Sequence, residues 1–376
     1  MRALQLTKFY APVRGGIESV TFELSEGLNK VGIATDVLCA HTAPTTIRET
    51  ASAGYQITRA ASFGKLLSTS MAPAMIRELG RAQKGYDVIH VHLPDPLSNL
   101  ALLLTRPRAR IVLHWHSDII NQPRALRVYA PLQRWLLQRA DVIIATSQAY
   151  ADASPWLAPH REKIRVIPIG IRDHPFDDGM ALRVRASYPS RRIVFSLGRM
   201  SYYKGFDTLI DAAAQLPPDC VVLVGGGGEL LDTHRRTVAK RKLTERIVFL
   251  GPLDDSQVLA HLRAGDVFCL PSIVRAEAFG VVLLEAMAAE RPIVTTDIPG
   301  SGVPWVCPDG LTGLNAPVGD SVALARALTT LLDNKSLSQR LGAAARERFM
   351  QHFTAERMVR ATADLYRDIC LFGSGT

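Results

Sequence analysis

The sequence predicts an α/β fold in which two doubly wound parallel sheets face each other across a cleft. Short apolar runs rich in Val and Ile alternate with longer segments of helical periodicity along most of the 376 residues. This alternation is typical of parallel strands covered by helices on both faces. The length exceeds what one hydrophobic core usually serves. A charged stretch rich in Pro and Gly at 168–190 interrupts the rhythm midway and predicts a domain boundary there.

Each predicted domain receives enough strands for one doubly wound sheet. The expected strands of the first half are Ala3–Thr7, Thr35–Cys39, Asp87–His92, Arg110–Trp115, Val142–Ala145 and Ile164–Pro168. Those of the second half are Arg192–Leu197, Cys220–Val224, Ile247–Leu250, Val267–Leu270 and Pro292–Thr296. Amphipathic helices are expected at Gly16–Lys30, Arg124–Arg139, Phe206–Gln215 and Asp320–Asp333.

The chain becomes wholly helical after about Ser336, through Leu337–Met350 and Ala355–Leu371. We expect the last helix to cross back to the first domain, which then comprises 1–170 and 355–376. The second domain comprises 171–354. In doubly wound sheets, ligands bind beyond the carboxyl ends of the strands, so functional residues are expected on strand-to-helix loops.

Composition limits the class of protein. The five cysteines are scattered and never spaced as CxxC, which argues against a disulfide framework or a zinc ribbon and favours a reducing compartment. No stretch approaches the roughly 18 apolar residues of a membrane span, and the N-terminal apolar run is too short for a signal peptide. We therefore expect a cytoplasmic protein, either soluble or lying on a membrane surface.

The net charge of +9 is concentrated in the first half. Residues 1–171 hold 20 Lys and Arg against 12 Asp and Glu, a net of +8. This excess suggests an anionic partner such as phospholipid headgroups, a diphosphate-linked acceptor or nucleic acid, or simply a basic soluble surface. Nucleic acid is the weakest of these because no nucleic-acid module or aromatic-rich basic stripe is present.

The most specific pattern is Glu277-Ala-Phe-Gly-Val-Val-Leu-Leu-Glu285. A turn at Phe279–Gly280 is expected to begin a helix over Val281–Glu290. Amides near Val281–Leu283 would then lack intrahelical partners and could bind an anion. A loop carboxylate, free amides and a helix carboxylate together suit a nucleotide sugar, whereas two spaced acids alone would be unremarkable.

A second pattern joins the first strand of the second domain to its helix. Arg199 and Lys204 stand five residues apart on a loop between Gly198 and Gly205. Arg offers a bidentate fork and Lys a point charge, so the pair could meet the two phosphates of a diphosphate. Solvated loop cations are the plain alternative.

Glycines follow a predicted strand in each half of the chain. Gly15-Gly16 open the first helix, and their amides could approach a ligand, although a tight turn is equally consistent with them. Gly225–Gly228 follow a strand of the second domain and suggest a flexible backbone loop near donor phosphate or ribose. Their spacing does not fit GxGxxG with an acid about 20 residues on, which disfavours a dinucleotide site.

Histidines recur as His90-Val-His92 and His114-Trp-His116. Residues two apart on a strand share a face, so the two pairs could imitate a metal site. Zinc is disfavoured because a fourth ligand and supporting cysteines are missing. His116, at a strand's carboxyl end, is instead expected in the cleft, where imidazole could bind a sugar hydroxyl or stabilise charge. His90 and His114 are expected to pack within the sheet.

The strings GGIES, HWHSD, LGRMSYYKGFDTLI, RIVFLG and EAFGVVLLEAMA, in this order, resemble retaining glycosyltransferases of family 4 with the two-Rossmann GT-B fold. The likeness covers essentially the whole chain and extends to bacterial mannosyltransferases. It is strongest from Arg192 to Thr296. One departure is Ser201-Tyr202-Tyr203, where an acid often precedes the lysine.

The resemblance implies roles for individual residues. Those implied to act on the reacting groups are His116, Arg199, Lys204 and Glu277. Those implied to bind the donor are Gly15, Gly16, Gly226, Leu253, Phe279, Gly280, Val281, Val282 and Glu285. Glu277 would bind sugar hydroxyls and Glu285 the ribose. No metal is implied, in agreement with the absence of a DxD tripeptide.

The predicted reaction is transfer of a hexose, with retention, from a nucleotide-diphosphate sugar bound by the second domain to a saccharide or lipid-linked acceptor bound by the first. GDP-mannose is preferred from general similarity, but the base stays open between guanine and uracil. The expected process is lipopolysaccharide or other cell-surface polysaccharide synthesis, with an anionic membrane surface as a further partner. The alternatives are a nucleotide-sugar epimerase of the same fold, an NAD-linked oxidoreductase, and a non-catalytic nucleotide-sugar-binding protein.

Overall fold

A computed structural model describes the chain except for residues 14, 67–68, 121–122 and 372–376, and the side chains of 65–66 and 123–125. The chain divides into two compact units. Unit 1 comprises Met1–Arg172 and Thr354–Thr376, and unit 2 comprises Asp173–Phe353. The division lies close to the expected boundaries, shifted by a few residues. The expected boundary stretch also holds a helix, α6 (Asp178–Ala186), whose first turn is capped by Asp177.

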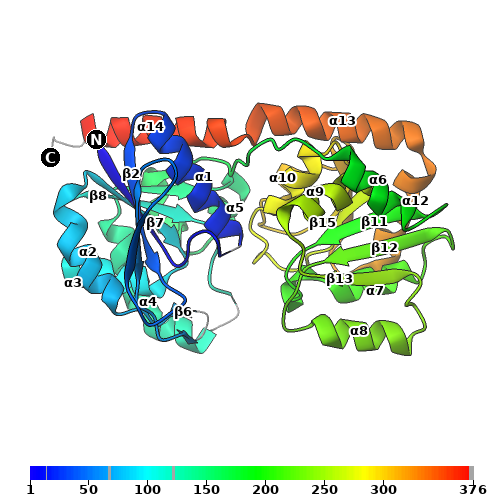
Figure 1. Cartoon of the computed structure of the whole chain (residues 1–376), viewed down its shortest axis with the longest axis horizontal. Helices are drawn as coiled ribbons and strands as arrows, with labels where there is room; N and C mark the ends of the chain where they lie inside the picture. The colour runs from blue at the N-terminus through cyan, green and yellow to red at the C-terminus, as the bar shows by residue number, and fades with distance from the viewer. Residues whose placement is uncertain (14, 67–68, 121–122, 372–376) are drawn as a thin grey trace. The chain divides into compact units, whose positions relative to one another are not determined.

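Unit 1 is built on an eight-stranded sheet with helices on both faces (Figure 1). The strand order is β10-β9-β8-β7-β1-β2-β4-β3, and all pairs are parallel except the edge pair β3 and β4. These strands are β1 (Arg2–Thr7), β2 (Ala34–Ala40), β3 (Ile47–Thr50), β4 (Gln56–Ala60), β7 (Val88–Leu93), β8 (Arg110–Trp115), β9 (Val142–Ala145) and β10 (Ile164–Val166). A separate small hairpin pairs β5 (Lys65–Leu66) with β6 (Thr69–Ser70).

Unit 2 has a six-stranded, wholly parallel sheet in the order β13-β12-β11-β14-β15-β16. Its strands are β11 (Arg192–Leu197), β12 (Cys220–Gly225), β13 (Ile247–Gly251), β14 (Val267–Leu270), β15 (Ile293–Asp297) and β16 (Gly313–Pro317). The order reverses direction between β11 and β14. In such sheets a ligand crevice forms at the carboxyl ends of the strands where the order reverses.

Helices cover both sheets, as the alternation of patterns predicts. Those of unit 1 are α1 (Gly16–Lys30), α2 (Ala74–Ala82), α3 (Pro96–Thr105), α4 (Pro123–Arg139), α5 (Gln148–Ala153) and α14 (Ala355–Leu371). Those of unit 2, besides α6, are α7 (Phe206–Ala213), α8 (Leu231–Lys240), α9 (Asp255–Ala264), α10 (Val281–Ala288), α11 (Val303–Val306), α12 (Ser321–Asp333) and α13 (Lys335–His352). Short 3-10 turns lie at Gln83–Gly85, Ala158–Lys163 and Tyr202–Lys204.

Most strands of both sheets are continuous apolar runs and are buried, whereas the edge strands β3 and β10 are largely exposed. In unit 2 the core includes Val194, Val222 and Cys269 from the sheet and Leu324 and Leu328 from α12. Helices on both faces exclude water from such runs, which is the situation in which parallel sheets are stable. The expectation of two doubly wound α/β sheets is therefore confirmed.

The last helix, α14, belongs to unit 1 although it follows the helices of unit 2 in the chain. It packs on α1 so closely that a Cβ at Gly27 would lie 2.3 Å from Val359. The chain enters this helix beside Gly170, where a Cβ would lie 2.2 Å from the carbonyl oxygen of Thr354. The helix thus returns to the first domain, as the sequence predicts. Among the described residues, no helix combines the length and hydropathy needed to cross a bilayer.

Candidate functional site

The loops that follow β11 and β14 meet at the reversal point of the unit 2 sheet. The backbone amide of Ile273 donates to the carbonyl of Tyr203 at 2.8 Å. Gly205 has a φ of +66°, and a Cβ there would lie 2.1 Å from the carbonyl oxygen of Pro271. Only glycine permits this close approach of the two loops. Sequence patterns that lie about 70 residues apart are thereby brought together.

Lys204 and Glu277 form the centre of this junction. The Nζ atom of Lys204 donates to Oε2 of Glu277 at 2.5 Å, and the Ser272 hydroxyl donates to the same oxygen at 2.9 Å. Both charged residues are buried. Burial acts to lower the pKa of Lys204, but the adjacent Glu277 carboxylate outweighs it, so this pKa lies above its usual value. The pair is therefore a buried ion pair that keeps its positive end charged.

Arg199 lies exposed on the same loop. Its guanidinium repels the Lys204 ammonium and opposes the rise in the pKa of Lys204. The two cations are therefore close enough to interact electrostatically, as expected for groups that bind one anion together. The 3-10 turn Tyr202–Lys204 occupies the place where the resembling family often has an acid.

Helix α10 begins directly after the Glu277 loop. Gly280 precedes it with a φ of +76° and gives no side-chain cap. In the described structure the amides of Val281 and Val282 donate no hydrogen bond. They are therefore free to donate to an anion, as predicted. Leu283 was expected to offer a third amide, and this expectation is wrong. Its N–H donates to the carbonyl of Gly280 at 2.8 Å, tightening the first turn.

Glu285 lies one turn into α10, and its Oε2 is buried with no hydrogen-bond partner. Burial and, to a smaller extent, the charge of Asp255 raise the pKa of this carboxyl to about 7, while Lys204 acts in the opposite direction. An unsatisfied buried carboxylate oxygen is costly unless a ligand supplies a donor. A pair of ribose hydroxyls is a ligand that would satisfy it.

Phe279 cannot bind a ligand through its ring. The side chain is buried, with its centroid 6.2 Å from that of Trp305 and 5.9 Å from that of Phe353. The predicted donor contact is therefore limited to its backbone. The aromatic cluster instead anchors the loop on which Glu277 stands.

Two serines that sequence reasoning missed hold the Glu277 loop in place. Ser272 donates to the carboxylate, and Ser301 donates to the backbone carbonyl of Glu277 at 2.5 Å. Both side chains are fully or almost fully buried. Ser272 lies two residues after the end of β14, so its position in a loop that follows a predicted strand was the signal available in the sequence.

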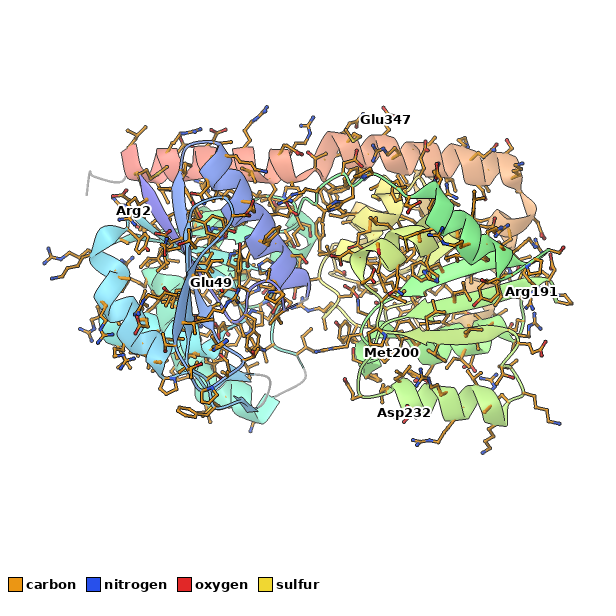
Figure 2. All side chains as sticks on the ribbon, viewed as in Figure 1. Arg2, Glu49, Arg191, Met200, Asp232 and Glu347 are labelled. Carbon is orange, nitrogen blue, oxygen red and sulfur yellow. The ribbon has the colours of Figure 1, made fainter. Side chains whose placement is uncertain are left out.

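The glycine loop 225–228 is tightly fixed rather than flexible, which corrects the expectation from sequence. Gly226 has a φ of +122°, and a Cβ there would lie 2.0 Å from the carbonyl oxygen of Gly198. The amide of Met200, which is labelled in Figure 2, donates to the carbonyl of Gly227 at 2.8 Å, and the Met200 side chain is buried. These contacts position the Arg199 loop. A Cβ at Gly225 would lie 2.7 Å from Leu253, so that predicted residue borders the same loop.

The predicted residues of unit 1 lie at the carboxyl ends of β1 and β8. Gly15 caps α1, and its carbonyl accepts from the amide of Ser19 at 3.0 Å. Gly16 is the first residue of that helix. His116 follows β8, and its amide donates to the carbonyl of Leu93 at 3.1 Å.

All four histidines of the two HxH patterns gather on one face of the unit 1 sheet. The parallel register places His92 beside His114. The rings of His114 and His116 stack with centroids 4.1 Å apart, and those of His90 and His92 stack at 4.8 Å. All four side chains are buried, and burial holds the pKa of each below its usual value. His116 is therefore neutral, which favours hydrogen bonding over charge stabilisation.

The loop carrying His116 is braced by Asp118. Its Oδ1 accepts from the indole of Trp115 and from the hydroxyl of Ser154, each at 2.8 Å. The amide of Asp118 donates to the hydroxyl of Tyr150 at 2.7 Å. The HWHSD string is thus a strand end followed by a rigid turn.

Three of the histidines resemble a metal site in their spacing. The ring nitrogens of His90, His92 and His114 lie within 4.8 Å of one another. Both nitrogens of His92 already have hydrogen-bond partners, however. The rings also stack nearly parallel, whereas ligands of one ion must aim their lone pairs at a common point. The arrangement favours a hydrogen-bonded stack.

Comparisons with known proteins match both units. Residues 14–174 match the sequence model of Glycosyltransferase Family 4, and residues 182–348 match that of Glycosyl transferases group 1. The O-antigen chain mannosyltransferase C of Escherichia coli is 36% identical over 376 residues, covering 97% of this chain and 98% of that protein. The chain is a family 4 glycosyltransferase.

Other proteins support the same assignment for the glycosyltransferase. The D-rhamnosyltransferase WbpZ of Pseudomonas aeruginosa is 32% identical over 359 residues, covering 94% of this chain and 93% of that protein. A sucrose-phosphate synthase structure from Thermosynechococcus elongatus has a TM-score of 0.81 at 23% identity and covers both chains fully. The shared architecture is the GT-B fold. These findings do not favour the epimerase, oxidoreductase or binding-protein alternatives.

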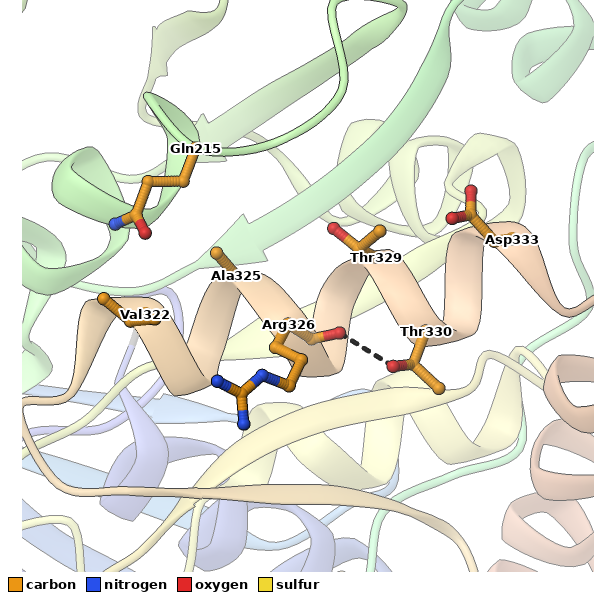
Figure 3. A pocket seen from close by; sticks show the side chains of 7 residues that line it. All are labelled: Gln215, Val322, Ala325, Arg326, Thr329, Thr330 and Asp333. Carbon is orange, nitrogen blue, oxygen red and sulfur yellow. Dashed lines mark hydrogen bonds between the residues drawn. The ribbon is translucent and has the colours of Figure 1, made fainter.

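A recess on the surface of the glycosyltransferase lies apart from these residues. Figure 3 shows it along α12, and its lining residues are Gln215, Val322, Ala325, Arg326, Thr329, Thr330 and Asp333. Its volume is about 320 Å³, but no predicted site residue lines it. One lining contact, from the Thr330 hydroxyl to the Arg326 carbonyl at 2.8 Å, is internal to the helix. Because none of the residues predicted to act on the substrate lines the recess, it is not taken as the candidate site.

Proposed function

We propose that this glycosyltransferase moves a hexose, with mannose as the first candidate, from a nucleotide-diphosphate sugar to a saccharide or lipid-linked acceptor, retaining the anomeric configuration and using no metal ion. The observation that carries the proposal is the Lys204–Glu277 ion pair beside the free amides of α10. A cation, a carboxylate and two amides at one strand-end junction suit a diphosphate attached to a sugar.

Charge development explains the roles assigned in unit 2. As the bond to the anomeric carbon breaks, negative charge accumulates on the departing diphosphate. Arg199, Lys204 and the amides of Val281 and Val282 would stabilise it as fixed donors in place of a divalent cation. Glu277 would bind sugar hydroxyls, and Glu285 the ribose. Gly15, Gly16 and neutral His116 would contribute from unit 1.

Retention is proposed to proceed without a covalent enzyme intermediate, because the two carboxylates of the described site, Glu277 and Glu285, are assigned to sugar and ribose hydroxyls. The acceptor hydroxyl would attack from the side of the leaving group. A phosphate oxygen of that group would take the hydroxyl proton, so the new glycosidic bond forms as the bond to phosphate breaks. The released nucleoside diphosphate carries the transferred proton.

The proposed process is the synthesis of lipopolysaccharide or another cell-surface polysaccharide. The support is full-length similarity to an O-antigen chain mannosyltransferase and to a D-rhamnosyltransferase. A screen of nucleotide sugars tests which donor the enzyme uses. Purified protein is incubated with GDP-mannose, GDP-rhamnose, UDP-glucose and UDP-N-acetylglucosamine, and released nucleotide is measured. Preference for a GDP-hexose supports the proposal, and release from none of them with any saccharide acceptor contradicts it.

Unit 1 is also proposed to bind an anionic membrane surface, at the inner face of the cytoplasmic membrane. Unit 1 carries 24 Lys and Arg against 15 Asp and Glu, and so holds all of the net charge of +9. It also exposes Phe63 and Met71, whose backbones pair at 2.9 Å. Basic charge with adjacent exposed apolar side chains favours an interfacial location.

Liposome flotation tests this location. Binding to vesicles containing anionic lipid is expected to weaken as salt rises, because screening shortens the reach of the charges. The double variant Phe63→Ser, Met71→Ser should bind less than wild type, while Leu182→Ser, an exposed apolar residue of unit 2, serves as the control. Equal binding to neutral and anionic vesicles would contradict the location without affecting the proposed reaction.

A further inference from the structure

Three of the four buried histidines, His90, His92 and His116, belong to one hydrogen-bonded chain that ends at His116. Gln5 on β1 contacts His92 through Oε1, 2.9 Å from Nε2 of His92. Nδ1 of His92 lies 3.0 Å from Nε2 of His116. On the other side, Nε2 of Gln5 donates to the hydroxyl of Tyr366 at 3.1 Å. Tyr366 stands on α14 and contacts Nδ1 of His90 at 2.5 Å.

The direction of each hydrogen bond in this chain follows from Gln5. An amide oxygen can only accept, so the Nε2 atom of His92 that faces it must carry a proton. Burial keeps the pKa of His92 well below its usual value, so the ring is neutral and holds only that proton. Its Nδ1 is therefore bare and accepts from Nε2 of His116.

The same reasoning determines which ring nitrogen of His116 carries the proton. This ring is also neutral, since its pKa is lowered by burial and by His114 and His90. With its proton on Nε2 and directed to His92, its Nδ1 is left bare. Among the described residues, none forms a hydrogen bond with Nδ1 of His116.

We propose that Gln5 and His92 are positioning residues that hold His116 in the tautomer with a bare Nδ1, so that His116 meets the sugar as a hydrogen-bond acceptor. The inference rests on the proposed function of His116 as a sugar contact. A bare nitrogen selects a hydroxyl that donates, and it cannot donate to an oxygen of the substrate. The matching ligand chemistry is therefore a sugar hydroxyl rather than a phosphate or a carboxylate.

Helix α14 takes part through Tyr366. The tyrosine is fully buried and accepts from Gln5, so its own proton is available for His90. Turning the Gln5 amide over would reverse the sense of every bond up to His116. Tyr366 accepts from Nε2 of Gln5 in this network, so the C-terminal helix supplies a partner for the amide on which the tautomer of a residue at the carboxyl end of β8 depends.

Nitrogen NMR of the full chain labelled with ¹⁵N-histidine tests the tautomer directly. Chemical shifts separate a protonated from a bare imidazole nitrogen, and the signals of His116 are assigned by their loss in His116→Gln. We expect Nε2 of His116 to be protonated and Nδ1 to be bare at neutral pH. The reverse assignment would overturn the inference, whatever the activity of the enzyme.

Variants connect the tautomer to catalysis. Gln5→Met removes the amide oxygen that accepts from His92 and keeps a side chain of similar volume. Tyr366→Phe removes the hydroxyl to which Gln5 donates. Both are expected to give mixed His116 tautomers and a kcat lower by about two- to tenfold, the cost of one ordinary hydrogen bond. Thr362→Val is the control, because Thr362 is buried on the same helix but donates only to the Met358 carbonyl.

The outcomes distinguish the sugar contact of His116 from the positioning role of its hydrogen-bonded neighbours. Unchanged tautomers and unchanged kcat in Gln5→Met and Tyr366→Phe would overturn the positioning role. Full activity of His116→Gln would remove the proposed sugar contact, even if the NMR signals showed the expected tautomer. Loss of activity in His116→Gln together with the reversed tautomer would leave the proposed function standing and reject the inference alone.

Discussion

Lys204 and Glu277 are 73 residues apart in sequence, yet their side chains form a buried ion pair with Nζ and Oε2 2.5 Å apart. The pair exists because β11 and β14 are neighbours in the sheet of unit 2, so the loops after them converge. Each residue is the oppositely charged partner of the other. The two residues are therefore coupled in both stability and activity.

Removing one member of this pair is expected to damage stability as well as turnover. Lys204→Ala leaves Glu277 buried with only the Ser272 hydroxyl as a described partner. Breaking a buried pair in this way typically costs about 3–5 kcal/mol. Urea unfolding should show this loss for Lys204→Ala and for Glu277→Ala, and transfer activity should fall by at least about a hundredfold.

The double variant Lys204→Met, Glu277→Gln separates these two effects. It removes both charges, so the free energy of unfolding should recover toward that of wild type while activity stays low. Wild-type turnover in this variant would contradict the role of the pair in the reaction. A double variant as unstable as the single ones would show that the ion pair is not the source of their instability.

Arg199 provides a test that is free of this complication, because the residue is exposed. Arg199→Ala should remain as stable as wild type and lower kcat by about 10²–10³, the usual cost of one fixed oxyanion donor. Arg326→Ala, on α12 within the recess of Figure 3, is the matched control for loss of one arginine. Equal kcat values for the two variants would exclude Arg199 from the reaction.

Donor binding should depend on pH through Glu285. Its pKa of about 7 means that it is largely protonated at pH 6 and largely ionised at pH 8. Ribose hydroxyls donate to the ionised form, so affinity should rise with pH, by about tenfold between pH 6 and pH 8. Calorimetry with an intact nucleotide sugar measures this, because its diphosphate keeps the same charge over the range. A Glu285→Gln variant should show a flat profile, and a steep one would assign the dependence to another group.

The glycine loop predicts a stability difference between two similar substitutions. Gly226→Ala places a Cβ 2.0 Å from the Gly198 carbonyl oxygen at a φ of +122°, so the backbone must move. Gly251→Ala has a φ of +77° but meets nothing within 4 Å. The second change should cost about 1–2 kcal/mol and the first clearly more. Equal melting temperatures would mean that the two loops are not packed as described.

The sequence predicted the sheets of the fold closely wherever strands are buried apolar runs. Arg110–Trp115, Val142–Ala145, Arg192–Leu197 and Val267–Leu270 match strands at both ends. The strands β3, β4 and β16 and the hairpin of β5 and β6 were missed. Strand β3 is an exposed edge strand, β4 is a short strand in which polar residues interrupt the apolar ones, and β16, Gly313–Pro317, has no β-branched residue. Edge positions are held by pairing rather than by a hydrophobic pattern, so periodicity does not reveal them.

The candidate site was predicted as a set of residues rather than as a set of contacts. Motif strings located Lys204, Glu277 and Glu285, but nothing local indicated that Lys204 pairs with Glu277. The histidine cluster shows the same limit. Two HxH patterns were visible, whereas their common face depends on the register of β7 and β8. Gln5 and Tyr366 carried no signal at all, because their roles arise only from tertiary packing.

Fixed cations and amides of unit 2 are proposed to replace a metal ion beneath the leaving diphosphate. The most direct measurement is the initial rate of sugar transfer by enzyme stripped of divalent metal, with and without excess EDTA, and again with added Mn²⁺ or Mg²⁺. We predict the same rate, within about twofold, under all conditions. A rate that disappears in EDTA and returns only with a divalent cation would contradict the claim.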